Sequence, residues 1–257
     1  MSITRIIPQR GINDDGKGKK HALHKLIAAA ETEYVWLQDD DVTFPQLADF
    51  DNLPSTVISR FSTSDLLILP LRMAGGNSLL ERLQRAEYAA IQQLTIDSAL
   101  KGRPVMCSGA NLIVRRERWL ESWNDLHPEI PSGDDMFLLE SFKRRGLKIE
   151  VLDEPQYTAV VQPVKTWKAF FRQRMRWAGK APHYTDRDIR RCGILILCAN
   201  LLQILCPLVL VVKFPLEYRL IKKRDASVSL IDALILELLY PFYMLVCLVG
   251  GLFRRQW

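Results

Sequence analysis

The chain has 257 residues, enough for one domain of ordinary size and an appendage. Its formal net charge of +6 and pI near 9.1 suit nucleic acid, an anionic membrane surface or phosphate-bearing substrates as partners. No nucleic-acid-binding motif with the required spacing occurs, which excludes nucleic acid as a partner. Acidic residues are concentrated in residues 1–191, whereas residues 192–252 are dominated by Leu, Ile, Val and Cys and are flanked by basic residues. The charge distribution therefore favours a membrane surface.

The N-terminal region begins with a short β-like run at residues 3–7 and continues through a polar loop to a predicted helix at His21–Glu33. Gly16-Lys17-Gly18-Lys19-Lys20 lies just before this helix. Backbone amides at a helix N-terminus attract anions, and nearby lysines strengthen the attraction. The ending required of a Walker loop is absent, so this stretch is interpreted as a simpler anion-binding loop that includes Lys17.

Three consecutive carboxylates, Asp39-Asp40-Asp41, follow a predicted buried strand at Tyr34–Leu37. A run of like charges at a strand end is costly unless a cation lies nearby, and an oxygen-only cluster suits Mg²⁺ or Mn²⁺. Mg²⁺ usually takes one or two protein carboxylates and completes its shell with water and phosphate. The triplet therefore predicts a phosphorylated substrate. The alternative is a polar loop in which Asp39 or Asp41 caps a turn.

Between the triplet and the apolar tail, runs of strand length alternate with helical patterns. The predicted strands are Asp65–Leu71, Leu112–Val114 and Lys148–Leu152. The predicted helices are Ser78–Leu100, Arg115–Asn124 and Met136–Arg145. This alternation predicts an α/β layered domain with a mainly parallel sheet.

A second acidic pair, Asp134-Asp135, opens the last of these helices after Ser132-Gly133. Ser132 and Asp135 have the spacing of a capping box, and the local pattern favours a capping role. The functional alternative is that one aspartate caps the helix while the other serves as a general base, because neighbouring carboxylates raise a carboxyl pKa.

The segment Thr166–Lys180 combines aromatic and basic residues. Gln173, Arg176 and Trp177 have the spacing of one helical face, where an amide, a guanidinium and an indole can bind phosphate and stack on a sugar ring. The alternative is an interfacial membrane helix with aromatic residues among the lipid headgroups. Both interpretations can hold, because they use opposite faces.

Two apolar segments follow, at Ile194–Val212 and Leu230–Phe253. The connecting loop, residues 213–225, is strongly basic. If both segments cross the membrane once, this loop lies outside, against the positive-inside tendency. A re-entrant first segment kinked at Pro207 removes the conflict and is the topology we expect.

These motifs together resemble a membrane-anchored family 2 glycosyltransferase of the GT-A fold. The matching pieces, in chain order, are Gly16-Lys17-Gly18 with Ala22-Leu23, Asp39-Asp40-Asp41 followed by Pro45, Ser108-Gly109-Ala110-Asn111, Gly133-Asp134-Asp135 and Gln173-Arg174-Met175-Arg176-Trp177. The last piece, Gln-x-x-Arg-Trp, is the most specific of the five. The resemblance implies a GT-A-like catalytic domain at residues 1–160, an interfacial helix region at 161–191 and a membrane-associated tail at 192–257.

The resemblance also implies an activity: inverting transfer of a sugar from a nucleotide-diphosphate sugar to a glycan or lipid-linked acceptor at the cytosolic face of the cell membrane. Asp39 and Asp41 would hold Mg²⁺ or Mn²⁺, with Asp41 favoured as the direct ligand. Asp135 would be the base that deprotonates the acceptor hydroxyl. The implied substrate-binding residues are Lys17, Asp40, Asn111, Asp134, Gln173, Arg176 and Trp177, with Asn111 on the acceptor side. The acid triplet, the later Asp pair and the Gln/Arg/Trp face are expected to meet around one divalent ion at the mouth of a single sheet.

The chain departs from the family pattern in one respect. Two further strands, carrying nucleotide contacts and another aspartate, precede the Gly-Lys-Gly loop in the family, whereas only about fifteen residues precede it here. A chain lacking that half of the nucleotide site is expected to bind nucleotide sugar weakly and to have little activity. The alternative from another functional class is a non-catalytic membrane scaffold or a partner subunit of a polysaccharide synthase.

Overall fold

A computed structural model describes residues 3–8, 18–47, 63–130 and 132–253. The chain divides into two compact units. The first unit, called unit 1, comprises Met1–Leu71 and Ile96–Val161. The second, called unit 2, comprises Arg72–Thr95 and Gln162–Trp257. A segment from the middle of the chain, Arg72–Thr95, therefore belongs to unit 2 together with the C-terminal residues.

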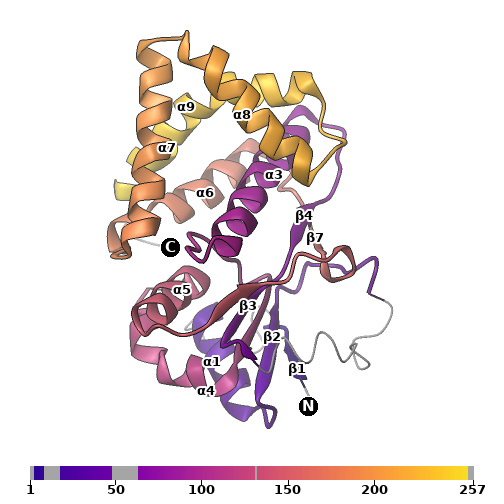
Figure 1. Ribbon diagram of the computed structural model, residues 1–257, viewed down its shortest axis with the longest axis vertical. Coiled ribbons are helices and arrows are strands. Elements are labelled where there is room, and N and C mark those ends of the chain that lie inside the picture. Colours follow the sequence, from indigo (N-terminus) through magenta and orange to yellow (C-terminus); the bar gives the residue numbers. More distant parts are fainter. Residues whose placement is uncertain (1–2, 9–17, 48–62, 131, 254–257) are drawn as a thin grey trace. The chain divides into compact units, whose positions relative to one another are not determined.

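Unit 1 is built on a five-stranded sheet with the order β1-β2-β5-β3-β6 (Figure 1). Its strands are β1 (Ile3–Ile6), β2 (Tyr34–Gln38), β3 (Leu66–Ile68), β5 (Asn111–Arg115) and β6 (Ile149–Val151). The pairs β1–β2 and β3–β6 are parallel, whereas β5 is antiparallel to both of its neighbours. Four strands thus run in one direction, which confirms the predicted mainly parallel α/β sheet.

The two central strands have the apolar residues that a doubly covered sheet requires. All five residues of β2 and all three of β3 are buried. They contribute to a core cluster formed by Tyr34, Trp36, Leu67, Leu69, Ile113, Leu152 and Tyr157. The remaining short strand of unit 1 is β7 (Ala159–Val161).

The helices of unit 1 begin close to their predicted positions. They are α1 (Lys19–Ala29), α4 (Arg116–Glu121) and α5 (Asp134–Arg144). Helix α1 buries Ala22, Leu23 and Ile27, and it ends at Ala29 rather than at Glu33. Lys20, in its first turn, is fully buried, and its ammonium donates to the carbonyl oxygens of Leu126 and His127. The loop before α5 is thereby tied to α1.

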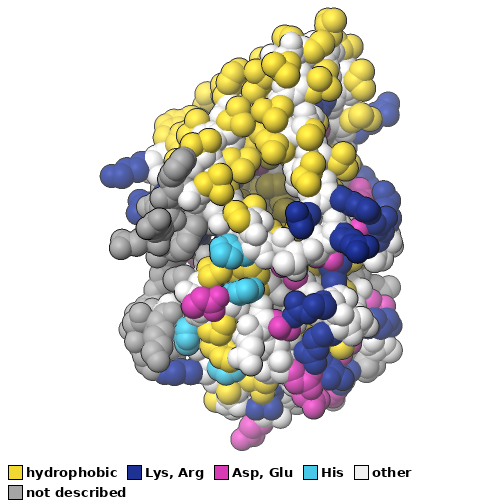
Figure 2. Space-filling model, turned by 90° about the vertical axis from the view of Figure 1, so that its left-hand side faces the viewer, with side chains coloured by type: hydrophobic (Ala, Val, Ile, Leu, Met, Phe, Trp, Pro, Cys, Tyr) yellow, Lys and Arg dark blue, Asp and Glu magenta, His cyan; other side chains and the backbone are white. Residues whose placement is uncertain are grey.

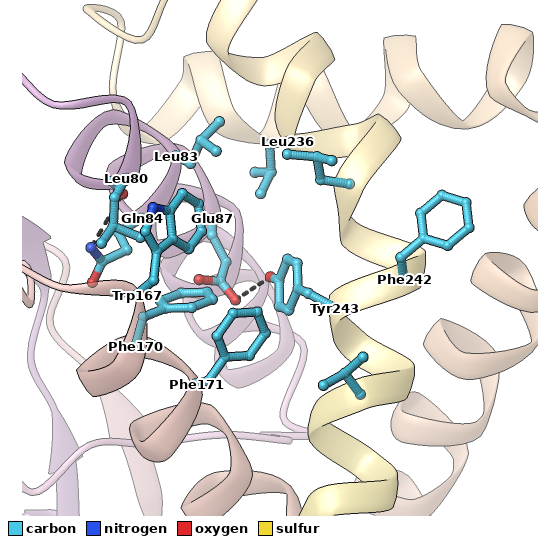
Figure 3. A pocket seen from close by; sticks show the side chains of 12 residues that line it. Leu80, Leu83, Gln84, Glu87, Trp167, Phe170, Phe171, Leu236, Phe242 and Tyr243 are labelled. Atoms are coloured by element: carbon cyan, nitrogen blue, oxygen red, sulfur yellow. Dashed lines mark hydrogen bonds between the residues drawn. The ribbon is translucent and has the colours of Figure 1, made fainter.

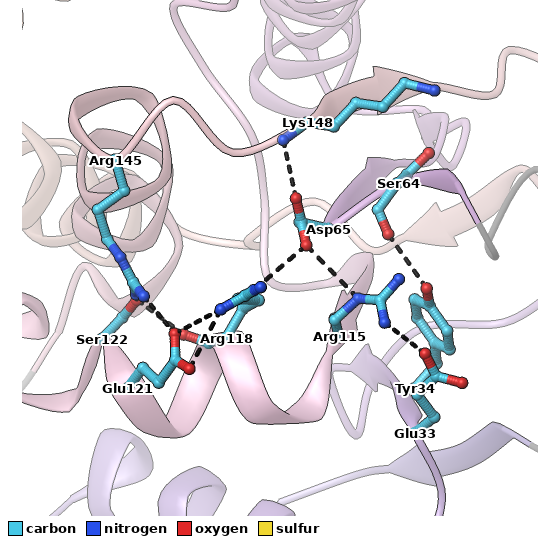
Figure 4. Close-up of polar contacts among 10 residues, drawn as sticks. All are labelled: Glu33, Tyr34, Ser64, Asp65, Arg115, Arg118, Glu121, Ser122, Arg145 and Lys148. Atoms are coloured by element: carbon cyan, nitrogen blue, oxygen red, sulfur yellow. Dashed lines mark hydrogen bonds and ion pairs between the residues drawn. The ribbon is translucent and has the colours of Figure 1, made fainter.

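A network of charged side chains joins the outer ends of these elements (Figure 4). Asp65 Oδ1 lies 3.4 Å from Arg115 Nε and 3.5 Å from Arg118 Nε. Its Oδ2 accepts a hydrogen bond from the Lys148 backbone N at 2.9 Å. Arg118 also pairs with Glu121 at 3.0 Å. One carboxylate, directly before β3, thus links β5, α4 and the residue before β6.

Replacing Asp65 with asparagine is expected to lower the free energy of unfolding by about 1–2 kcal/mol, because the amide keeps the Lys148 contact but loses the charge facing two guanidinium groups. Chemical denaturation followed by circular dichroism measures this change. The exposed Glu31, replaced by glutamine, is the control and should leave stability unchanged. Equal stability of the two variants would contradict a structural role for the Asp65 network.

Unit 2 is predominantly helical. It contains residues of β4 (Leu71–Met73), most of α3 (Leu79–Leu100), and α6 (Trp167–Ala178), α7 (Arg187–Leu205), α8 (Val209–Arg224) and α9 (Leu230–Phe253). Its buried apolar cluster is formed by Leu83, Ala86, Ala89, Ile221, Val228, Ala233 and Leu236. Helices α3, α8 and α9 therefore share one core.

The first apolar segment forms two helices rather than one span. Helix α7 ends at Leu205, the chain turns through Pro207, and α8 begins at Val209, so that the two helices form a V in Figure 1. Among the described helices, α9 is long and apolar enough to cross a membrane, over Leu230–Leu252. Figure 2 shows exposed hydrophobic side chains gathered over the tail helices. The tail thus presents an extended apolar surface.

The polar residues that interrupt the two apolar segments meet inside unit 2. Lys213 Nζ lies 2.9 Å from Asn200 Oδ1 and 2.9 Å from Gln203 Oε1, and it forms an ion pair with Glu237. Gln203 Nε2 also donates to the Glu237 carbonyl oxygen at 2.9 Å. Because each group satisfies another, these residues can be buried among apolar helices.

Candidate functional site

The candidate site of unit 1 lies where β2 ends and β5 begins. Gln38, the last residue of β2, is paired with Asn111, the first residue of β5. Because these strands are antiparallel, the loop before β5 reaches the same sheet edge as the residues after β2. Asp39 and the Ser108-Gly109-Ala110 loop are therefore neighbours in space.

Acidic residues from two elements meet at this edge. The ammonium of Lys19, in the first turn of α1, forms an ion pair with Asp39 Oδ1. Asp135 Oδ2 accepts a hydrogen bond from the Gly109 backbone N at 3.3 Å. A Cβ added at Gly109 would lie 3.2 Å from Asp134 Oδ2 and 3.8 Å from Lys19 Nζ. Lys19, Asp39, Asp134 and Asp135 are called the charged cluster below.

The charged cluster holds Lys19 in its protonated form. Burial alone would lower the pKa of Lys19, but the carboxylates of Asp134, Asp39 and Asp135 outweigh burial and raise it above its ordinary value. The lysine therefore remains a cation at any physiological pH. It offsets part of the acidic charge that the sequence places at this edge.

Cys107 lies beside the cluster, and its thiol donates to the Asp135 carbonyl oxygen at 3.2 Å. Burial, together with the negative charges of Asp135 and Asp134, raises the pKa of this thiol well above its ordinary value. Because the thiolate is the reactive form of cysteine, Cys107 is unsuited to act as a nucleophile. The role of Cys107 beside the charged cluster is therefore structural.

The predicted capping box at the start of α5 is wrong. The N-cap is Gly133, with φ of 85°, and no side chain accepts a capping hydrogen bond there. A residue with a Cβ adopts this left-handed conformation only at a cost. Asp135 instead directs Oδ2 to Gly109, while its Oδ1 accepts from the adjacent Met136 N at 2.8 Å. Asp134 and Asp135 thus face the loop before β5 and do not cap α5.

The carboxylates of the triplet differ in exposure. Asp39 is partly buried and forms an ion pair with Lys19, and Asp40 and Asp41 are exposed in the turn after β2. Within the described part of the chain, no three His, Cys, Asp or Glu side chains are placed to hold a metal ion together. Two carboxylates at Asp39 and Asp41 still match the number and oxygen chemistry that Mg²⁺ takes from proteins.

Asn111 has a structural role in unit 1. It is buried, and its Nδ2 donates to the carbonyl oxygens of Pro70 and Tyr157, at 2.8 Å each. Its Oδ1 accepts from Trp36 Nε1 at 2.8 Å. These three bonds use both N–H donors and one acceptor position of the amide, and the acceptor-side role of Asn111 stays a prediction.

The predicted Gln173, Arg176 and Trp177 face lies on α6 in unit 2, and all three residues are partly buried. Gln173 Oε1 accepts from Arg174 Nη1 at 2.6 Å, and the Arg174 guanidinium lies 4.2 Å from the Trp177 ring centre. That this face joins the charged cluster stays a prediction. Lys17, the predicted phosphate-binding lysine, lies outside the described residues.

Arg174 is the most deeply buried charged residue of α6 and is absent from the predicted set. It pairs with Glu87 of α3, with side-chain exposures of 4% and 6%. Glu87 Oε1 also accepts from the Tyr243 hydroxyl of α9 at 2.6 Å. The sequence signal was available, since Arg174 follows Phe170 by one helical turn and shares its buried face.

Comparison with known families identifies the family of the chain. A family model described as "Glycosyltransferase like family 2" matches residues 3–180, more than half of the chain, and thus covers both aspartate motifs and all of α6. No curated protein matches the chain. Four strands of the sheet run in one direction, and aspartates lie after β2 and at the start of α5. Because the family model matches the chain across all of these elements, the chain belongs to glycosyltransferase-like family 2.

Proposed function

We propose that the protein transfers a sugar, with inversion, from a nucleotide-diphosphate sugar to a glycan or lipid-linked acceptor at the cytosolic face of the cell membrane. The observation that carries this proposal is the charged cluster, in which Asp134 and Asp135 lie beside Gly109 and Lys19 links them to Asp39. Family membership supports sugar transfer in general. The apolar α9 supports attachment to a membrane.

Asp135 is the proposed general base. The Gly109 backbone N–H and the Met136 backbone N–H each donate to one of its oxygens, which fixes the plane of the carboxylate. A carboxylate held in this way can accept the proton of an acceptor hydroxyl as that oxygen attacks the anomeric carbon. Asp134, beside it and mostly buried, is proposed to orient the acceptor.

Asp39 and Asp41 are the proposed metal-binding residues, and Asp40 is proposed to contact the donor. Mg²⁺ or Mn²⁺, when bound, supplies positive charge to the diphosphate leaving group. The protein adds its own positive charge through Lys19, which already faces Asp39. Lys17, Gln173, Arg176 and Trp177 are proposed to bind the diphosphate and the acceptor, with the planar guanidinium of Arg176 suited to phosphate oxygens.

Replacing Asp41 with asparagine is expected to weaken Mn²⁺ binding in the presence of a nucleoside diphosphate by at least about tenfold, since even outer partners of metal ligands contribute that much. Electron paramagnetic resonance of free Mn²⁺ measures the affinity without requiring turnover. Glu31, which is exposed two residues after α1, is replaced by glutamine as the charge-matched control. If the Asp41 and Glu31 variants bind Mn²⁺ equally well, Asp41 is not a ligand.

The second candidate function is a non-catalytic membrane scaffold or a partner subunit of a polysaccharide synthase. It is favoured by the Lys19–Asp39 ion pair, because an internal cation already neutralises one of the two proposed metal ligands. The two functions differ in one measurement. Transfer of radiolabelled sugar from a panel of nucleotide sugars by the purified full chain supports the enzyme, whereas activity that appears only in a partner synthase supports the scaffold.

A further inference from the structure

Unit 2 contains an apolar pocket of about 330 Å³ between α3, α6 and α9 (Figure 3). Leu80 and Leu83 of α3 form one wall, and Leu236 and Phe242 of α9 form another. Three aromatic residues of α6, Trp167, Phe170 and Phe171, form a third wall. The volume is sufficient for a short length of hydrocarbon chain.

The two polar side chains in the pocket wall are engaged in internal bonds. Gln84 Nε2 donates to the Val164 carbonyl oxygen at 2.9 Å, and Gln84 Oε1 accepts from the Val164 backbone N at 3.1 Å. Glu87 accepts from Tyr243 and from Arg174. A sugar or phosphate entering the pocket would lose its water without gaining equivalent partners, which disfavours polar ligands. The lining therefore selects an apolar ligand.

The lining of the pocket is continuous with exposed apolar surface. Trp167 is 48% exposed, Phe242 59% and Val246 51%, although all three line the pocket. Phe242 and Val246 belong to α9, the helix with the length and composition of a membrane span. A hydrocarbon chain in the surrounding lipid would therefore reach the pocket without crossing water.

Basic side chains flank the aromatic residues of α6. Lys168 follows Trp167, and Arg172 follows Phe171, so that the two cations lie one helical turn apart. Both are exposed, and neither forms an ion pair with another described residue. Cations beside aromatic residues on an amphipathic helix suit the headgroup region of an anionic lipid.

From these observations we propose that the pocket binds one alkyl chain of an anionic membrane phospholipid, whose phosphate interacts with Lys168 and Arg172. This site goes beyond the proposed sugar transfer, since it requires contact with lipid but no reaction. The apolar lining accounts for the chain, and the basic flank accounts for the charge of the headgroup.

The test uses the full chain in phosphatidylcholine nanodiscs that contain a small fraction of phosphatidylglycerol brominated along its acyl chains. Bromine quenches nearby tryptophan fluorescence, and the Trp167 signal is isolated by subtracting the emission of the Trp167→Phe protein. Strong quenching of Trp167 is expected. Brominated phosphatidylcholine at the same fraction should quench less, and replacing Lys168 and Arg172 with glutamine should remove this difference.

A matched pair of variants separates pocket binding from general contact with lipid. Val246 and Val249 are both on α9 and are 51% and 54% exposed, but only Val246 lines the pocket. Val246→Asp should lose most of the quenching, whereas Val249→Asp should retain it. Leu239→Asp and Leu238→Asp repeat the comparison at 44% and 47% exposure if the first pair folds poorly.

Two results would overturn the proposal. Equal quenching in Val246→Asp and Val249→Asp would mean that Trp167 reports bulk lipid rather than a bound chain. Equal quenching by the two brominated lipids would show that Lys168 and Arg172 do not bind the anionic headgroup. Since neither readout involves sugar transfer, failure of the lipid site and failure of the proposed enzyme are distinguishable.

Discussion

Replacing Asp135 with asparagine is expected to slow sugar transfer by about 10²–10⁴-fold, the usual contribution of a general base. Asparagine is nearly isosteric and retains an oxygen that can accept from the Gly109 or Met136 backbone N. It cannot, however, take a proton from an acceptor hydroxyl. The loss should therefore appear in the rate constant, while the unfolding temperature changes little.

Steady-state kinetics across pH, with single-turnover transfer at saturating donor, provides the measurement. Asp65→Asn is a useful control, because it weakens the fold of unit 1 without touching the charged cluster. Nearly normal rates of sugar transfer by the Asp135→Asn protein would show that Asp135 is not the general base.

Replacing Arg174 with methionine is expected to lower the free energy of unfolding by about 3–5 kcal/mol, the cost of breaking a buried ion pair from one side. Methionine fills much of the same space, so the loss is mainly electrostatic. Glu87 would be left charged and 6% exposed, with the Tyr243 hydroxyl as its remaining partner. The contact that joins α3 to α6 would then oppose folding.

A double-mutant cycle tests this explanation directly. Adding Glu87→Leu to Arg174→Met removes the uncompensated charge and should restore part of the lost stability. The control is Arg176→Met, because Arg176 is partly exposed and has no ion pair with another described residue. Thermal and denaturant unfolding in detergent give the free energies. If the double variant has a lower free energy of unfolding than Arg174→Met, packing rather than charge dominates at this position.

Local sequence patterns predicted those elements whose formation depends on residues close together in the chain. A continuous apolar run predicted β2, and the acidic residues directly after it were correctly expected at the edge of the sheet. The helix signals placed the start of α5 within two residues of its position. Proximity of Asp39 to Asp134 and Asp135 also agrees with expectation, because both motifs lie at the same end of the sheet.

The remaining features depend on partners distant in the chain. The reversed direction of β5 cannot be deduced from its apolar residues, which suit either direction. The resemblance implied an acceptor-side role for Asn111 and none for Arg174, whereas the burial of both depends on Pro70, Tyr157 and Glu87, which are 41 or more positions away. The Gly133 cap depends on a left-handed backbone conformation that the neighbouring capping-box spacing concealed.

The V formed by α7 and α8 has a consequence for the shape of the surrounding lipid. Apolar residues near its vertex are strongly exposed, with Leu205 at 81% and Leu208 at 76%, while both of its free ends are basic. Such a wedge can enter one leaflet vertex first while its charged ends remain in water. It would then expand that leaflet alone and favour curvature. We therefore expect the protein to partition into small vesicles in preference to large ones, and equal partitioning would show that the V does not act as a wedge.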